Sequence, residues 1–75
     1  RALSVGILDQ MAPDLVSAGI AAQEGDAIVI NAEQIGIDKI LGSGRVTQKM
    51  NITARSFSEQ AKAKIEAIGG QALII

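Results

Sequence analysis

Apolar and polar residues nearly alternate over residues 45–55, RVTQKMNITAR. One set of alternate positions is apolar apart from Gln48, and it holds Val46, Met50, Ile52 and Ala54. The other set is polar and partly basic, and it holds Arg45, Thr47, Lys49, Asn51, Thr53 and Arg55. Because successive side chains of a strand point to opposite faces, the pattern predicts a half-buried strand over 45–55 with a basic outer face.

The N-terminal quarter of the chain has a helical pattern interrupted by a proline. Ser4 is a suitable cap for a helix beginning SVGILDQM, and Pro13 is suited to begin a second short helix, PDLVSAG, because a proline at the first helical position loses no hydrogen bond. Gly19 is expected to end this second helix. The residues expected to face the core are Leu15, Val16 and Ile20. One helix kinked at Pro13 is the alternative.

The middle of the chain predicts short elements joined by turns. Glu24, Gly25 and Asp26 form a turn signal, and the apolar run AIVIN at 27–31 predicts a strand buried on both faces. The segment AEQIGI is expected to be a turn or a single helical turn that ends at Gly36. The remaining ranges expected to be extended are 39–41, KIL, and 71–75, QALII.

Residues 56–70, SFSEQAKAKIEAIGG, predict an amphipathic helix that ends at Gly69. Its apolar positions at helical spacing are Phe57, Ala61, Ile65 and Ile68. Ser56 and Glu59 have the spacing of a capping box, and Ser58 is the competing cap. The elements together predict an α/β fold: a small single domain over 1–75, with short helices at the N-terminus, three to four strands in a small sheet, and one amphipathic helix packed on it.

The composition argues against catalysis. The 75 residues contain no Cys, His, Trp or Tyr, and Phe57 is the only aromatic residue. Thiol nucleophiles, imidazole bases and the usual zinc ligands are therefore absent, and we expect no enzymatic activity, no cofactor and no small-molecule substrate. No apolar run reaches about 18 residues, so no membrane-spanning helix is expected.

The charge is distributed unevenly along the chain. The net charge is −1, but residues 1–38 carry Arg1 against six acidic residues, and residues 39–75 carry six basic residues against two acidic ones. Such asymmetry favours two faces with different partners, and ordinary solvated surface is the alternative.

The glycines of LGSGRVTQK, residues 41–49, do not match a nucleotide-binding motif. A P-loop requires a Gly-Lys-Ser/Thr sequence that opens a helix, and Arg45 and Val46 follow Gly44 instead. A dinucleotide fingerprint requires a third glycine where Thr47 stands. The glycines therefore predict a tight turn in which another backbone comes close.

Basic residues on the predicted strand suggest contact with nucleic acid. On a continuous strand the side chains of Arg45, Lys49 and Arg55 would form a row about 33 Å long, which suits a path along phosphates. The main-chain N–H groups of Gly42, Ser43 and Gly44 are further candidate phosphate donors. A solvated strand face without a ligand is the alternative.

Residues 39–70, KILGSGRVTQKMNITARSFSEQAKAKIEAIGG, resemble the large-subunit ribosomal protein L-fifteen family. The residues that carry the resemblance are Lys39, Ile40, Leu41, Gly42, Gly44, Val46, Thr47, Met50, Ile52, Ala54, Phe57, Ser58, Ala61, Ile65, Gly69 and Gly70. Upstream, SVGILDQMAPDLVSAGI and EGDAIVINAEQIGIDKI are similar to the archaeal branch. The related L-eighteen-e family shares the second half and is the alternative.

The resemblance implies the C-terminal domain of a structural protein of the cytoplasmic ribosome, whose partners are large-subunit ribosomal RNA and neighbouring ribosomal proteins. It implies no catalysis, and the family's basic, glycine-rich N-terminal extension is not found in residues 1–75. The residues expected to contact RNA are Lys39, Gly42, Ser43, Gly44, Arg45, Thr47, Lys49, Arg55, Lys62 and Lys64. A non-ribosomal protein-interaction module, docking through the acidic half or the apolar C-terminal strand, is the rival class.

Overall fold

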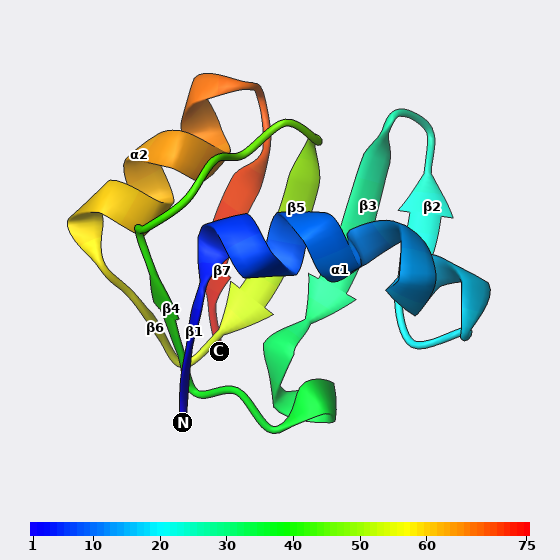
Figure 1. Cartoon of the computed structure of the whole chain (residues 1–75), viewed down its shortest axis with the longest axis horizontal. Coiled ribbons are helices and arrows are strands. Elements are labelled where there is room, and N and C mark those ends of the chain that lie inside the picture. The colour runs from blue at the N-terminus through cyan, green and yellow to red at the C-terminus, as the bar shows by residue number, and fades with distance from the viewer.

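The computed structural model describes all residues, 1–75 (Figure 1). The elements in chain order are β1 (Ala2–Ser4), α1 (Val5–Ser17), β2 (Ala22–Glu24), β3 (Ala27–Asn31), the 3-10 turn η1 (Ala32–Ile35), β4 (Lys39–Leu41), β5 (Met50–Ala54), β6 (Ser56–Phe57), α2 (Glu59–Ala67) and β7 (Gln71–Ile74). The α/β class is therefore confirmed. Neither helix combines the length and the apolar character needed to cross a lipid bilayer.

The strands form two sheets rather than one. The larger sheet has the order β2-β3-β5-β7, in which β3, β5 and β7 are parallel and β2 is an antiparallel edge strand. The smaller sheet has the order β1-β4-β6 and is parallel throughout. The predicted strands at 27–31 and 39–41 are confirmed, but burial of 27–31 on both faces was wrong, because Val29 is half-buried and Asn31 is exposed. The prediction of a single sheet of three to four strands was incomplete. It missed β1, β2 and β6, because strands of two or three residues are too short to show a pattern in the sequence.

Both helices cover the same face of the larger sheet (Figure 1). One buried cluster joins residues of α1 and α2 to alternate residues of the central strands, and its members include Leu8, Ala12, Ile30, Met50, Ile52, Ala61 and Ile65. The residues between them on the strands face the other way, and Val29, Asn51 and Thr53 are only half-buried there. Alternation along β5 thus separates the core from an uncovered sheet face, as expected for residues 50–54.

The N-terminal helical region is one continuous helix, α1, with Pro13 inside it. The alternative of a single helix was therefore correct, and the two short helices were wrong. A proline in a helix cannot donate to the carbonyl four residues earlier, which here belongs to Asp9. The side-chain amide of Gln48 donates to that carbonyl instead, at 2.7 Å. This tertiary hydrogen bond compensates for the one that Pro13 removes.

Both helices end at a left-handed glycine, as the sequence predicted. Gly19 and Gly69 have φ angles of 77° and 91°. The isoleucines beside these glycines, Ile20 and Ile68, are 41% and 40% exposed, so their predicted core positions were wrong. The chain reverses direction at each glycine and turns these side chains outward. At the start of α2, Ser58 is the cap, since its hydroxyl accepts from the Ala61 amide at 3.1 Å.

The predicted strand over 45–55 is only half present. Met50–Ala54 forms β5, but residues 45–49 belong to no strand. The amide groups of Thr47 and Gln48 donate to the carboxylate of Asp9 in α1, at 3.0 and 2.8 Å. These donors are therefore not available to pair with a neighbouring strand, and the predicted 33 Å row of cations does not exist.

Candidate nucleic-acid interface

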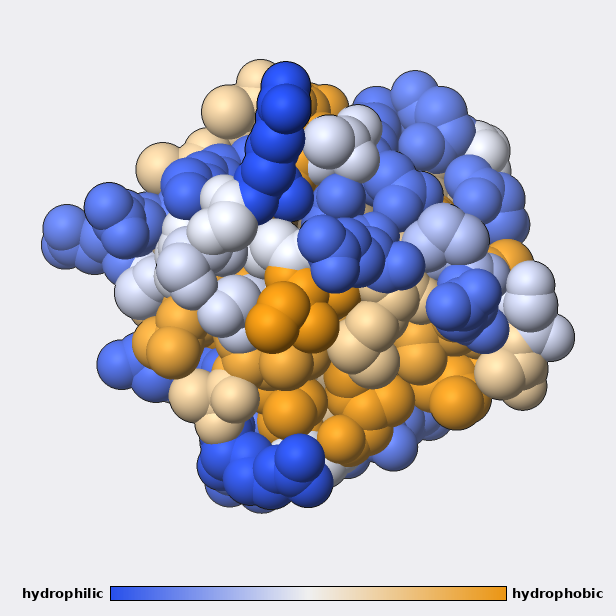
Figure 2. Space-filling view, in the orientation of Figure 1, coloured by the Kyte–Doolittle hydropathy of each residue, from blue (hydrophilic) through white to orange (hydrophobic).

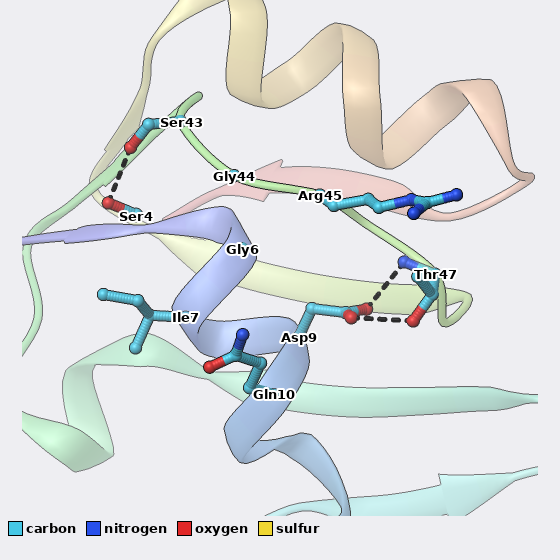
Figure 3. Close-up of a pocket in the computed structure, with 9 residues that line it drawn as sticks. All are labelled: Ser4, Gly6, Ile7, Asp9, Gln10, Ser43, Gly44, Arg45 and Thr47. Carbon is cyan, nitrogen blue, oxygen red and sulfur yellow. Dashed lines mark hydrogen bonds between the residues drawn. The ribbon is translucent and has the colours of Figure 1, made fainter.

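The segment Gly42–Thr47, here called the glycine loop, runs between the N-terminal turns of the two helices (Figure 3). A Cβ atom added to Gly42 would lie 2.8 Å from the amide nitrogen of Ala61 in α2. A Cβ atom added to Gly44 would lie 2.7 Å from the Cα atom of Gly6 in α1. The two glycines are therefore required by close backbone packing, as the sequence predicted, but the predicted tight turn is wrong, because residues 42–47 contain only a bend at Gly44.

Hydrogen bonds fix the glycine loop from both sides. The ammonium group of Lys64 in α2 donates to the carbonyl oxygens of Gly42 and Gly44, at 2.5 and 2.8 Å. On the other side, the Gly6 amide of α1 donates to the carbonyl oxygen of Ser43 at 3.1 Å. The Ser43 hydroxyl also donates to the Ser4 hydroxyl at 2.7 Å. Ser4 occupies the cap position of α1, as predicted, but its side chain makes no hydrogen bond to the helix.

Two hollows flank the glycine loop. The larger, of about 510 Å³, lies between the loop and α1 and is lined by Ser4, Gly6, Ile7, Asp9, Gln10, Ser43, Gly44, Arg45 and Thr47 (Figure 3). The smaller, of about 260 Å³, lies between the loop and α2 and is lined by Gly44, Arg45, Val46, Lys64, Ala67 and Ile68. Gly44 and Arg45 line both hollows, so Arg45 lies where the two hollows adjoin.

The predicted cations differ in whether they already have a partner. Arg45 is exposed and forms no ion pair within the chain, and the same is true of Lys39 and Lys62. Lys49 lies 3.3 Å from Asp26, and Arg55 lies 2.8 Å from Glu33. Lys49 and Arg55 flank opposite ends of β5, so they do not form a cluster with each other, and neither lines the two hollows beside Arg45.

Six of the ten predicted contact residues do come together around the loop, and they are Gly42, Ser43, Gly44, Arg45, Thr47 and Lys64. The other four, Lys39, Lys49, Arg55 and Lys62, lie outside the hydrogen-bonded loop. The bonds that Lys64 makes to two carbonyl oxygens give it a structural task that sequence reasoning had not foreseen.

Sequence reasoning missed Asp9, which is the only buried charged residue of the chain. Val5, Leu8 and Ala12 are buried on the same side of α1. Asp9 falls among these apolar positions when the helix is drawn as a wheel. A carboxylate on the apolar side of a helix indicates that the fold provides hydrogen-bond donors for it.

Comparison of the sequence with known proteins places this chain in a family. The family model described as ribosomal proteins 50S-L15, 50S-L18e and 60S-L27A matches residues 2–73. Similar curated proteins are named large ribosomal subunit protein uL15. The one from Methanothermobacter thermautotrophicus is 38% identical over 73 residues, and the one from Staphylothermus marinus is 41% identical over 73 residues. Archaeoglobus fulgidus has one that is 42% identical over 69 residues.

These matches cover 97%, 97% and 92% of this chain, but only 50%, 48% and 38% of the relatives. The chain thus spans about half the length of the curated relatives, or less. Because the family model extends over nearly every residue from β1 to β7, the chain belongs to the family of ribosomal proteins 50S-L15, 50S-L18e and 60S-L27A.

Proposed function

We propose that this chain is a structural part of the large subunit of the cytoplasmic ribosome, where it binds ribosomal RNA and supports subunit assembly. The family is one of ribosomal proteins rather than of enzymes. The relatives named above are large ribosomal subunit proteins, which supports RNA and neighbouring ribosomal proteins as partners.

The observation that carries the proposal is that Arg45, a cation without an ion pair, lies on a loop whose backbone is fixed. The glycine loop is fixed to both helices by hydrogen bonds and by glycine contacts, and Arg45 lies in it without an acidic partner. Because the loop backbone is already fixed, little backbone entropy is lost when the Arg45 side chain binds a phosphate. The hollow between the loop and α1 gives a phosphate group room to approach Arg45.

The remaining predicted cations have supporting roles in this proposal. Lys39 and Lys62 are unpaired and neutralise phosphates at longer range. Lys49 and Arg55 must first exchange Asp26 and Glu33 for a phosphate. Exposed ion pairs are worth only about 0–1 kcal/mol, so the exchange is possible but reduces the gain. Arg45 therefore contributes more to RNA affinity than Lys49 or Arg55.

The test is binding to an in vitro transcript of the large-subunit ribosomal RNA of Methanothermobacter thermautotrophicus across a range of salt concentrations. Arg45→Glu is expected to weaken binding by about ten-fold or more and to reduce the salt slope by about one. Arg55→Glu changes the net charge equally and is the matched control, for which a smaller loss is expected. Equal losses for the two variants would show that net charge, and not the glycine loop, governs binding.

The edge strand β7 supports a second contact, with a neighbouring ribosomal protein. Leu73, Ile74 and Ile75 are 46%, 73% and 60% exposed at the open edge of the larger sheet. Exposed apolar residues on an edge strand favour pairing with another chain. Ile74→Lys is expected to leave affinity for the RNA transcript unchanged and to reduce incorporation into large subunits reconstituted from RNA and proteins. Normal incorporation would exclude this contact.

A further inference from the structure

We propose that Asp9 is a positioning residue for the RNA contact: it touches no RNA, and it holds the segment that carries Arg45. This inference rests on the proposed function. Asp9 lies in the second turn of α1 and is 5% exposed, yet none of the three ion pairs of the chain involves it. A buried carboxylate without a cation requires strong hydrogen-bond donors, and their identity shows what the carboxylate does.

All the donors to the Asp9 carboxylate come from two consecutive residues of the segment after Arg45. Its Oδ1 atom accepts from the amide groups of Thr47 and Gln48 at 3.0 and 2.8 Å. Its Oδ2 atom accepts from the Thr47 hydroxyl at 2.8 Å (Figure 3). Hydrogen bonds to an ionised group are about twice as strong as neutral ones, so Asp9 fixes this segment firmly against α1.

The main chain of Asp9 adds a fourth hydrogen bond to the same segment. Pro13 has no amide hydrogen, so the Asp9 carbonyl lacks its partner within the helix. The side-chain amide of Gln48 donates to it at 2.7 Å. The position of Gln48 among apolar residues in the alternating pattern of 45–55 is thereby explained, because its side chain is directed toward α1. The hydrogen bond from Gln48 to the Asp9 carbonyl, which Pro13 leaves unpaired, therefore links the helix to the loop.

These hydrogen bonds fix the backbone next to Arg45. On the N-terminal side of Arg45, Gly44 is held by Lys64 and by its contact with Gly6. On the C-terminal side, Thr47 is held by Asp9. Arg45 and Val46 span the short distance between these two anchors, and Figure 3 shows the Arg45 side chain extending from this span. With both anchors in place, the backbone at Arg45 is fixed, and this sets the point on the surface from which the exposed Arg45 side chain extends.

A carboxylate beside an RNA contact also needs an explanation of its own, because it repels phosphates. Asp9 lines the larger hollow, but it is buried and its three hydrogen bonds from Thr47 and Gln48 offset part of its charge. The gain from ordering Arg45 is then obtained with little repulsion. An apolar residue at position 9 would leave the donors of Thr47 and Gln48 without an acceptor, so Asp9 both satisfies these donors and fixes the segment that carries Arg45.

A thermodynamic cycle on affinity for the RNA transcript tests the inference. Asp9→Ala is expected to weaken binding at least five-fold in the wild-type background but less than two-fold in the Arg45→Ala background, because coupled residues are not additive. In the Arg55→Ala background, the matched control, the effect of Asp9→Ala should remain complete. Asp9→Asn keeps an oxygen that accepts from the Thr47 and Gln48 amides, so it is expected to retain most of the affinity. It also keeps the test valid if the Asp9→Ala variant does not fold.

Amide hydrogen exchange provides an independent measurement. The Thr47 and Gln48 amides are expected to be protected in the wild type and in Arg45→Ala, and to lose protection in Asp9→Ala. An additive cycle, or equal coupling to Arg45 and Arg55, would overturn the inference and leave the proposed function intact. An Arg45→Ala variant that binds RNA as the wild type does would overturn both. Unprotected amides in the wild type would overturn the positioning role alone.

Discussion

Gly6 of α1 and Gly44 of the glycine loop meet through their backbones, and neither has room for a side chain. A Cβ atom on Gly6 would lie 2.6 Å from the Gly44 Cα atom, and one on Gly44 would lie 2.7 Å from the Gly6 Cα atom. Gly44 also has a φ angle of 89°. We expect Gly44→Ala to destabilise the fold by about 2–4 kcal/mol, since a steric overlap of about 1–3 kcal/mol adds to backbone strain.

The matched control for this prediction is Gly19→Ala. Gly19 has a φ angle of 77°, but nothing lies within 4 Å of an added Cβ atom. Backbone strain alone, of about 1 kcal/mol, is expected there. Urea unfolding of the two variants separates the contribution of the contact from that of the φ angle. If both variants lost the same stability, the contact between Gly6 and Gly44 would not be a constraint on the sequence.

Lys64 is expected to stabilise the fold as well as to contribute a positive charge. Lys64→Met keeps the aliphatic part of the side chain but removes the hydrogen bonds to the carbonyl oxygens of Gly42 and Gly44. A loss of about 1–3 kcal/mol in the free energy of unfolding is expected, since hydrogen bonds from a charged donor are lost. Lys62→Met is the control, because Lys62 is exposed, and its effect should stay within about 0.5 kcal/mol. Similar values for both would contradict a structural role for Lys64.

The contrast between residues 45–49 and 50–54 shows what the sequence pattern could predict. Both halves alternate, and only the second is a strand. Alternation reports which side chains face the core, and it correctly assigned Met50, Ile52 and Ala54 to the interior. It does not report where the amide groups find acceptors. For residues 47 and 48 the acceptor is Asp9, far away in the sequence, so only the folded chain reveals it.

Sequence signals such as a glycine after a helix predicted the backbone correctly, because the conformation there depends on neighbouring residues in the chain. Gly19, Gly36 and Gly69 all have positive φ angles, as their positions after helical segments indicated. Very short strands such as β6 contain too few residues to show a period, and they form because parallel neighbours are already in place. The candidate site was half predictable for the same reason. The close packing at the glycines follows from the sequence, whereas the partners of Lys64, Lys49 and Arg55 depend on tertiary packing, and the RNA contact of Arg45 stays a prediction.

The link between Pro13 and Gln48 can be tested by a double-mutant cycle. Gln48→Ala leaves the Asp9 carbonyl unpaired and is expected to cost about 1–3 kcal/mol. Pro13→Ala restores an amide hydrogen that can bond to the same carbonyl, so Gln48→Ala should cost less in that background. Chemical denaturation of the four variants measures the coupling. Additive effects would show that the carbonyl does not need Gln48.

The final prediction concerns Arg55, whose guanidinium group lies 2.8 Å from Glu33. Glu33→Gln removes this carboxylate and leaves Arg55 free to bind a phosphate. Because the pair is exposed, the free energy of unfolding should change by less than about 1 kcal/mol. Affinity for the ribosomal RNA transcript should rise roughly two- to three-fold at low salt, and the gain should decrease as salt screens the added contact.

Removing any acidic residue lowers repulsion from RNA, so the Glu33 variant needs a control of equal charge. Glu24→Gln provides it, since Glu24 is exposed on β2 and forms no ion pair. The gain from Glu33→Gln should exceed that from Glu24→Gln, and the excess should vanish when Arg55→Ala is added. An excess that persists without Arg55 would mean that Glu33 itself repels the RNA and that Arg55 is not a contact.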